Sequence, residues 1–310
     1  MKRQRQLLVA AGGAATRVAT GLIAWALVAI IAACSPSPSL PPSAAPISSA
    51  TPDASSDASP SASAGGTTVV RAYFYLDGPM GSAGLVPVAR EIPEQLTVGT
   101  AALEALLAGP TNDETAAGVA SAVPAGSRLL GLAIADGVAT VDLSTEFDSG
   151  GGSTSIFVRL GQVIYTLTQF PTVQAVRFQI DGRLVTVFSS EGLIIDSPLG
   201  RSDNDDVLPA IFVDRPAFGA TLGNPARISG SANVFEAAFL ITILDGNGAR
   251  LAEVPAMATC GTGCRGTFDV TIAYSVTEAG WGTLRAWDAS ARDGSPENVR
   301  DYPVWLTPAE

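Results

Sequence analysis

Apolar residues follow three different patterns along this chain, and each pattern predicts a different structure. Residues 18–33 form a nearly unbroken apolar run. Residues 67–195 combine short segments of alternating apolar and polar residues with two segments of helical spacing. Residues 208–308 contain short alternating runs separated by turn residues. The pattern therefore predicts an N-terminal apolar segment followed by two folded domains.

The first folded region, residues 67–195, is predicted to be an α+β domain with helices on one face of a mixed or antiparallel sheet. Two helices are expected, each ended by a proline. Asp136-Gly137 and Asp181-Gly182 are hairpin turn signals. Strands are expected at residues 69–76, 85–92, 129–135, 138–143, 173–180 and 184–188.

The second folded region, residues 208–308, is predicted to be a β-sandwich of five or more strands. Trp287 and Trp305 are expected to pack in its core. Trp281 lies between two glycines, so two placements stay open. It packs in the core or at its edge, or it sits in a loop and contacts a partner or a sugar.

The N-terminal segment has the features of an export signal, predicted over residues 1–33. A basic start precedes the apolar run, and small residues precede a cysteine. The quartet Ile31-Ala32-Ala33-Cys34 resembles the bacterial lipobox, which implies cleavage before the cysteine and its modification with lipid, palmitate included. The alternative is an uncleaved anchor helix, although the apolar run is short for a membrane span.

A stalk is expected after the lipidation site. Residues 34–66 are nearly all Ser, Pro, Ala, Thr and Gly, a composition that cannot bury enough apolar surface to fold. The stalk would hold the folded domains clear of the lipid surface. We therefore expect an extracytoplasmic protein that is lipid-anchored to the outer face of the cell membrane.

Several segments of the first domain resemble the GerMN domain of bacterial sporulation and germination lipoproteins. They are YFYLDG, ALEALLAGP, VDLSTEF, GGGS, YTLTQFP and VQAVRFQIDG, and they occur in the family's order. The resemblance implies a cell-envelope protein with an assembly or interaction module. It supplies no catalytic residues to transfer to this chain.

The second domain resembles the immunoglobulin-like domain found beside GerMN in germination proteins. The segments that carry the resemblance are SGSANVFEA, LDGNG, AWDASARDGS and YPVWL. The fold class predicted for the whole chain is thus an α+β domain followed by an all-β immunoglobulin-like sandwich.

The chain has three cysteines, and lipidation of Cys34 would leave two thiols, those of Cys260 and Cys264. Outside the cytoplasm such a pair is expected to form a disulfide, here one that pins a strand connection. Metal binding is the weaker alternative because the chain has no histidine. A redox role would usually show two residues, not three, between the cysteines.

The amino-acid composition excludes several classes of partner and of catalytic site. The net charge of −11 argues against nucleic acid and against electrostatic adhesion to anionic lipid. The absence of histidine excludes Ser-His-Asp and Cys-His catalysis. Residues 196–207 are predicted to be an acidic, solvated linker, with calcium binding by 203–206 as the alternative. No metal site and no cofactor are expected.

Asp142, Glu146 and Asp148 form the most acidic cluster of the first domain. Paired carboxylates can hydrolyse glycans, but carboxylates on a strand and before a helix N-terminus have an ordinary structural role. We therefore expect a non-catalytic envelope lipoprotein that binds an envelope protein or a cell-wall component, with Glu146, Asp148 and Trp281 as possible contacts. A glycan-acting enzyme that uses the acidic cluster and a solute-binding lipoprotein are the alternatives.

Overall fold

The computed structural model describes residues 66–94, 97–188 and 192–309. The predicted signal peptide, the lipobox residues Ile31, Ala32 and Ala33, and the lipidation site Cys34 lie outside them. The predicted stalk does as well, apart from its last residue. Within the described ranges, no helix has the length and apolar character needed to cross a membrane.

The first domain is an α+β domain, as predicted. Its strands are β1 (Thr67–Leu76), β2 (Gly84–Pro93), β3 (Val119–Ala120), β4 (Leu129–Ala135), β5 (Val138–Leu143), β6 (Ala175–Ile180), β7 (Arg183–Leu184), β8 (Val187–Phe188) and β9 (Leu193–Ile194). Its helices are α1 (Val98–Leu107), α2 (Asn112–Ala116), η1 (Thr145–Asp148) and α3 (Ser153–Leu167).

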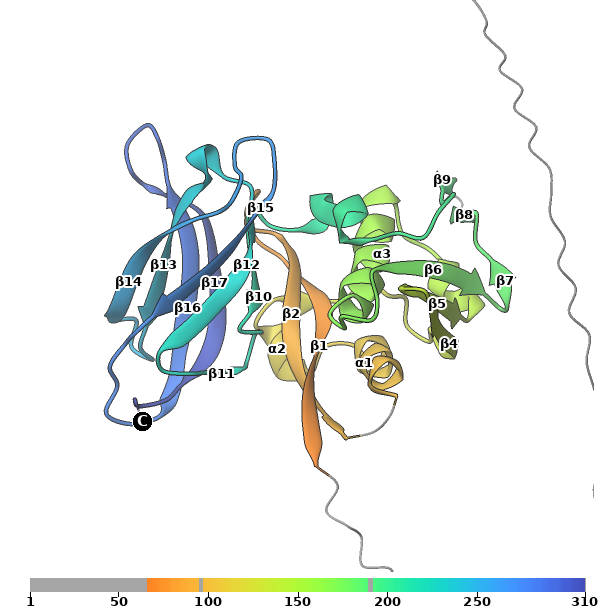
Figure 1. The fold of residues 1–310 in the computed structure, drawn as a ribbon, viewed down its shortest axis with the longest axis horizontal. Coiled ribbons are helices and arrows are strands. Elements are labelled where there is room, and N and C mark those ends of the chain that lie inside the picture. Colours follow the sequence, from red (N-terminus) through yellow and green to blue (C-terminus); the bar gives the residue numbers. More distant parts are fainter. Residues whose placement is uncertain (1–65, 95–96, 189–191, 310) are drawn as a thin grey trace, which may run out of the picture. The chain divides into compact units, whose positions relative to one another are not determined.

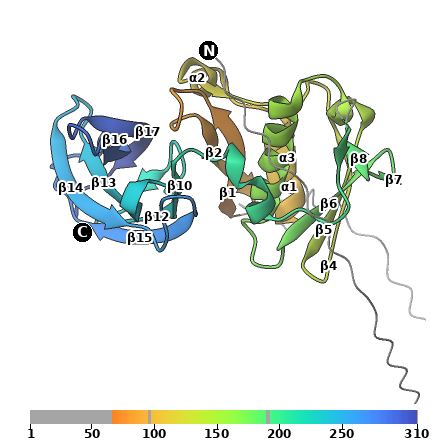
Figure 2. The ribbon, with the colours of Figure 1, turned by 90° about the horizontal axis from the view of Figure 1, so that it is seen from above.

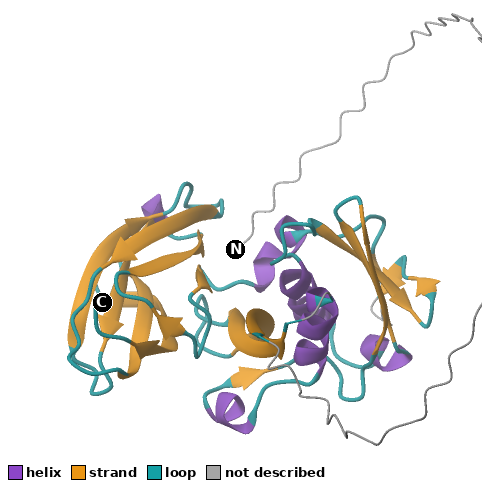
Figure 3. Ribbon diagram, turned by 60° about the horizontal axis from the view of Figure 1, so that its bottom comes forward, coloured by secondary structure: helices purple, strands orange, loops and turns teal. Residues whose placement is uncertain are grey.

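These strands form two main sheets, each with helices packed on one face. One sheet has the order β2-β1-β3 and the other the order β4-β5-β6-β7. Helices α1 and α3 lie between the two sheets and contact both (Figure 1). Figure 3 shows the same layering, with the long helices of this domain between strands and its short helices at the periphery. The faces that meet bury Phe74, Leu103, Val141, Leu160 and Phe178 almost completely, which makes one apolar core.

The hairpin of β4 and β5 has the residue bounds that the sequence predicts. Asp136 and Gly137 adopt φ angles of 51° and 79°, the left-handed conformation that this two-residue turn requires. Strands β5 and β6 run parallel and are joined across α3, so the sheet is mixed.

Two details of this domain differ from expectation. The hairpin across Asp181-Gly182 is short, because β7 pairs with β6 at only two positions and β8 pairs with β9. Helix α2 was not predicted, although its start is a capping box. The Thr111 side chain accepts a hydrogen bond from the Glu114 amide, and the Glu114 side chain accepts one from the Thr111 amide.

The second domain is an immunoglobulin-like sandwich of two sheets (Figure 2). Three strands form the sheet with the order β10-β12-β15, and five form the sheet with the order β11-β17-β16-β13-β14. The strands are β10 (Ile211–Arg215), β11 (Thr221–Leu222), β12 (Ala226–Ala232), β13 (Ala238–Leu244), β14 (Arg250–Met257), β15 (Gly266–Ile272), β16 (Gly280–Ala289) and β17 (Pro296–Leu306).

The segment predicted to be a solvated linker is partly packed. Residues Arg201–Val207 form a 3₁₀ helix, η2, that contacts α3. Asp203 and Asp206 are exposed as expected, but Asn204 and Val207 are buried. The prediction was wrong for those two residues because it considered only the charge of the segment. Val207 is an apolar side chain that α3 covers, since a Cβ on Gly161 would lie 2.8 Å from it.

The described residues belong to one compact unit, and the two folded domains contact each other within it. Phe218 forms backbone hydrogen bonds with Pro87 and Ala89 at the edge of β2. The buried Arg300 of β17 donates to the carbonyl oxygens of Ser82, Gly84 and Leu85. These bonds fix the first domain against the second.

Candidate functional site

One cleft has a volume of about 650 Å³ and is lined from both sides of the domain junction. Tyr165 of α3 and Arg201, Ser202 and Asp205 of η2 contribute from one side. Strands β10, β12 and β15 and the loop before β15 contribute from the other. Five of the lining residues carry hydroxyl groups on Ser or Thr: Ser202, Ser229, Ser231, Thr259 and Thr267.

A polar network around Asp214 forms one wall of this cleft. The Asp214 carboxylate accepts a hydrogen bond from the Tyr73 hydroxyl, with an oxygen–oxygen distance of 2.5 Å. Arg71 and Arg201 approach the same carboxylate to 3.8 and 3.7 Å. Arg201 also lies over the Tyr165 ring, 4.6 Å from its centroid. The charge of Asp214 is therefore matched by two arginines before any ligand binds.

Burial affects the protonation states of the tyrosines and the arginine in this wall. Desolvation, with Asp214 as the second cause, raises the pKa of Tyr73 well above its usual value. Desolvation and the neighbouring Asp205 raise the pKa of Tyr165 in the same way. Burial alone would lower the pKa of Arg201, but Tyr73 and Asp214 more than offset it and the net shift is upward. Both tyrosines are therefore neutral and the arginine is charged near neutral pH.

Arg265 lies on the opposite side of the cleft and has a different environment. Its guanidinium donates to the carbonyl oxygen of Pro209 at 2.9 Å and makes longer contacts, 3.3 and 3.4 Å, with Ser231. Within the described residues, no carboxylate oxygen lies within 4.0 Å of its nitrogens. Burial lowers its pKa, and Asp205 is the main opposing influence. Arg265 is thus a partly buried cation without a direct anionic partner.

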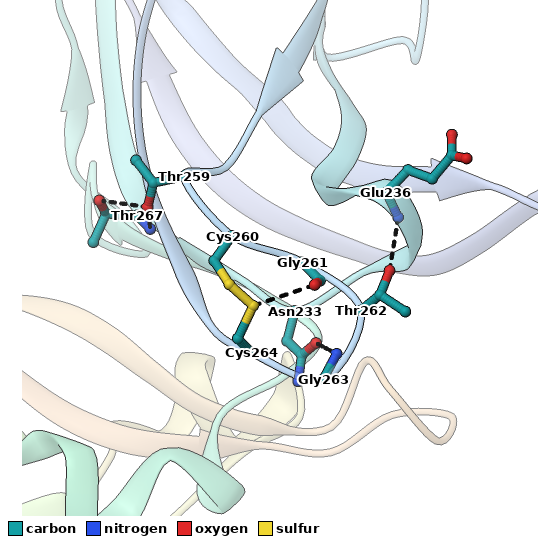
Figure 4. Close-up of a disulfide and its surroundings, with 9 residues drawn as sticks. All are labelled: Asn233, Glu236, Thr259, Cys260, Gly261, Thr262, Gly263, Cys264 and Thr267. Atoms are coloured by element: carbon teal, nitrogen blue, oxygen red, sulfur yellow. Dashed lines mark hydrogen bonds between the residues drawn. A yellow bond between two sulfur atoms is a disulfide. The ribbon is translucent and has the colours of Figure 1, made fainter.

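The predicted cysteine pair holds the loop that leads into Arg265 (Figure 4). The structure places Cys260 and Cys264 as a disulfide pair, with their Cα atoms 5.8 Å apart. The loop between them is fixed at two further points. The Asn233 side chain accepts a hydrogen bond from the Gly263 amide, and the Thr262 hydroxyl accepts one from the Glu236 amide. The disulfide therefore restrains the loop that directly precedes Arg265, a residue that lines the cleft.

The floor of the cleft requires a glycine. A Cβ atom on Gly230 of β12 would lie 1.9 Å from the carbonyl oxygen of Phe212 and 2.9 Å from the ring of Phe268. Without a side chain at Gly230, β10 and β12 approach closely and the cleft stays open above them.

The acidic cluster is not assembled into one site. Asp142 accepts a hydrogen bond from the Gly182 amide and so supports the turn after β6. Glu146 interacts with the Ser144 hydroxyl, which lowers its pKa. Asp148 lines a separate cleft that neither Asp142 nor Glu146 lines. A glycosidase needs one carboxyl group with a raised pKa, whereas the pKa of Glu146 is lowered.

The triple glycine beside that cluster is organised by Arg159 of α3. This buried side chain donates to the carbonyl oxygens of Ala122, Phe147 and Gly150. Gly150 and Gly151 have φ angles of 60° and 84°, which favour glycine. The loop therefore has a structural explanation.

Trp281 lies on strand β16 and not in a loop, and 56% of it is exposed. It faces Trp305 of β17 in an edge-to-face pair, with ring centroids 5.4 Å apart. Trp305 is 36% exposed, so the prediction that it packs in the core was wrong. Both side chains follow the outward alternation of the five-stranded sheet. Trp287 is half-buried on the same strand and donates its ring N–H to Thr242.

In the described part of the chain, no three His, Cys, Asp or Glu residues are grouped closely enough to hold a metal ion. Asp203, one of the candidate calcium ligands, accepts a hydrogen bond from the Gly200 amide. The Asp205 carboxylate accepts one from the Tyr165 hydroxyl. The cleft thus offers charged donors, hydroxyl groups and aromatic rings, a set suited to binding a ligand.

Two family models match this chain. The model named Germane, described as "Sporulation and spore germination", matches residues 71–186. The model named Gmad2, described as "Immunoglobulin-like domain of bacterial spore germination", matches residues 210–295. These matches confirm the two resemblances found in the sequence.

Solved structures with similar folds include domains of the sporulation protein GerM from Bacillus subtilis. Its first GerMN domain is 24% identical, with 44% of this chain and 99% of that chain covered and a TM-score of 0.37. Its tandem GerMN domains are 19% identical, with 66% and 61% covered and a TM-score of 0.39. No curated protein matches the chain. The TM-scores are low, so the domain assignment rests on the family models.

Proposed function

Because the chain carries a Germane domain followed by a Gmad2 domain, we propose that it is a non-catalytic lipoprotein of the cell envelope. It acts as a binding or assembly module in a process related to sporulation, germination or the cell wall. Its partner is an envelope protein or a cell-wall component.

The observation that carries this proposal is the cleft between η2 and the β10-β12-β15 sheet. Its walls supply arginine side chains, hydroxyl groups and aromatic edges, as recognition sites do. The tyrosines that line or border it have pKa values shifted away from neutral pH, so neither is suited to act as a general base there. Binding fits these groups better than catalysis does.

Rigidity of the domain junction supports the same proposal. The Asp214 network and the Arg300 hydrogen bonds join the two domains through buried or half-buried charged groups. A fixed junction holds the cleft in one shape and reduces the entropy lost when a partner binds.

The lipid anchor on Cys34 would place this cleft outside the membrane, at the end of the stalk 34–66. Mass spectrometry of the mature protein tests the anchor. We expect cleavage before Cys34 and a diacylglycerol-modified N-terminus, and an unmodified Cys34 would contradict the proposal. Loss of membrane association in Cys34→Ala would separate lipid anchoring from other modes of attachment.

Capture from membranes and from purified cell wall tests the binding role. The full-length protein is compared with Thr267→Asp, which places a charge at the cleft rim, and with Thr277→Asp, which changes an exposed threonine that does not line the cleft, as the matched control. We expect Thr267→Asp alone to lose a retained partner. Retention of the same components by all three proteins, or no retention by any, would contradict a binding role for the cleft.

A further inference from the structure

We propose that the cleft binds a small organic carboxylate through Arg265, an inference that rests on the proposed binding role of the cleft and adds its ligand class. The argument begins with the charge balance of the walls. Asp214 is matched by Arg71 and Arg201, and Asp269 is matched by Arg227, whose nitrogens lie 2.5–3.1 Å from its oxygens. Both aspartates therefore have their charges balanced by arginines of the protein itself.

Two arginines line the cleft. Arg201 is paired with Asp214, whereas Arg265 has no carboxylate partner of this kind among the described residues. Its protein acceptors are neutral groups, the Pro209 carbonyl oxygen and the Ser231 carbonyl and hydroxyl oxygens. A guanidinium carries five N–H donors, so some remain available toward the cleft. Taking a cation partly out of water is costly, and the charge of Asp205, which lies beyond ion-pair distance, offsets only part of that cost. A bound carboxylate would supply that anion and accept two parallel hydrogen bonds.

Asp205 selects among anions. It lines the same cleft, and within the described residues its carboxylate has the Tyr165 hydroxyl as its hydrogen-bond donor and no arginine or lysine within 4.0 Å. Its negative charge disfavours a doubly charged ligand such as a phosphate monoester more strongly than a singly charged carboxylate. The same carboxylate can accept a hydrogen bond from a hydroxyl or amino group of the ligand. The preferred ligand is therefore a carboxylate that also carries such donors.

The size and lining of the cleft fit this class. A volume of about 650 Å³ holds a molecule of the size of one or two sugar or amino-acid units. Ser231 contacts Arg265, and Ser229 and Thr267 add hydroxyl groups to the lining of the same cleft. Carboxylates of this size that also carry hydrogen-bond donors include sugar acids, which have hydroxyl groups, and the C-terminal residues of peptides, which have an amide N–H.

The disulfide between Cys260 and Cys264 supports the same proposed carboxylate site. Arg265 directly follows Cys264, and the bridge to Cys260 limits the conformations of the loop that precedes Arg265. Reduction of the bridge would free the loop and lower the affinity without removing any group that contacts the ligand.

Calorimetry or ligand-observed NMR with the folded protein tests the proposal. The probes are glucuronate, an N-acetylated dipeptide with a free C-terminus, the corresponding dipeptide amide, glucose and inorganic phosphate. We expect at least one of the two carboxylates to bind about tenfold more tightly than its neutral analogue, and more tightly than phosphate. Binding should weaken as salt concentration rises.

Variants of Arg265 test whether this residue binds the carboxylate. Arg265→Gln is expected to weaken carboxylate binding by about tenfold and Arg265→Lys by less, because the lysine keeps the charge but loses the paired geometry. Arg285→Gln, which alters an exposed arginine paired with Asp301 on the other sheet, is the control and should bind as the wild type does. A melting curve for each variant verifies that it is folded.

Three results would overturn the carboxylate assignment. They are no binding of either carboxylate at millimolar concentrations, equal binding of the carboxylates and their neutral analogues, and equal binding by Arg265→Gln and Arg285→Gln. Tighter binding of phosphate would also contradict it. If any of these occurs while cellular components are still retained in a cleft-dependent way, the ligand class is wrong and the proposed function stands.

Discussion

The Tyr73 hydroxyl of β1 donates a hydrogen bond to the Asp214 carboxylate of β10, and this bond joins the two domains. The residues are 141 positions apart in the chain. Arg71, two positions before Tyr73, approaches the same carboxylate. Asp214 therefore holds groups of the first domain at the edge of the second, beside the candidate cleft.

Replacing Asp214 should destabilise the protein. Asp214→Ala leaves two arginines and a tyrosine hydroxyl without their acceptor in a half-buried position, so we expect a loss of about 2–3 kcal/mol in the free energy of unfolding. Urea denaturation followed by tryptophan fluorescence measures it. Asp301→Ala removes the partner of Arg285 in an exposed pair and should cost less than about 1 kcal/mol. Equal losses in the two variants would show that the Asp214 network does not join the domains.

Alkaline pH should also destabilise the protein. The pKa values of Tyr73 and Tyr165 are raised by burial in the folded state, whereas in the unfolded chain they are about 10. The folded state therefore holds these protons more tightly, and the stability is full below about pH 10 and falls as pH rises further. Each tyrosine contributes a loss of about 1.4 kcal/mol per pH unit above that point. Unfolding measured between pH 8 and 11 for the wild type and for Tyr73→Phe tests this, since the variant should lose stability less steeply. Identical slopes would contradict the buried, neutral state of Tyr73.

Two glycines of the second domain should respond differently to the same change. Gly230→Ala is expected to be strongly destabilising, by about 3 kcal/mol or more, because its Cβ would overlap the Phe212 carbonyl oxygen. Gly280→Ala has open space around its Cβ and should change the stability by less than about 1 kcal/mol. Thermal denaturation of both variants checks the prediction. Similar melting temperatures would mean that β10 and β12 can separate at little cost.

The cysteine pair should be oxidised in the exported protein. Titration of the unreduced, denatured protein should find no free thiol from Cys260 or Cys264. Their replacement by serine should cost roughly 2 kcal/mol, the value expected for closing so short a loop in the chain-entropy model. Two reactive thiols would rule the bridge out.

Local signals predicted much of the fold. The bounds of β4 and β5 follow from alternation and from the Asp136-Gly137 turn, and both are properties of neighbouring residues. Helices α1 and α3 follow from apolar spacing. Strands β8 and β9 were not predicted as a pair, because two-residue strands have no periodicity to detect. Helix α2 begins with a capping box, Thr111 to Glu114, which is a local signal, but the helix has only five residues and no buried face that would give it apolar spacing.

The candidate cleft could not be read from the sequence in the same way. Arg265 directly follows Cys264 in the sequence, but no local pattern indicates that its guanidinium contacts Pro209 and Ser231. The partners of Asp214 come from β1 and η2, and such long-range contacts leave no spacing signal. Among the predicted site residues, Cys260 and Cys264 lie beside the cleft, whereas Glu146, Asp148 and Trp281 do not line it.

Site-specific photo-crosslinking in intact cells tests most directly whether this protein binds an envelope component at the cleft. A photoreactive amino acid replaces Thr267 at the cleft rim in the full-length chain, and in a matched protein it replaces Glu297, an exposed residue that does not line the cleft. We predict a discrete crosslinked product with an envelope protein or cell-wall fragment from position 267 and none from position 297. Equal products from both positions, or no product from either, would contradict the proposed function.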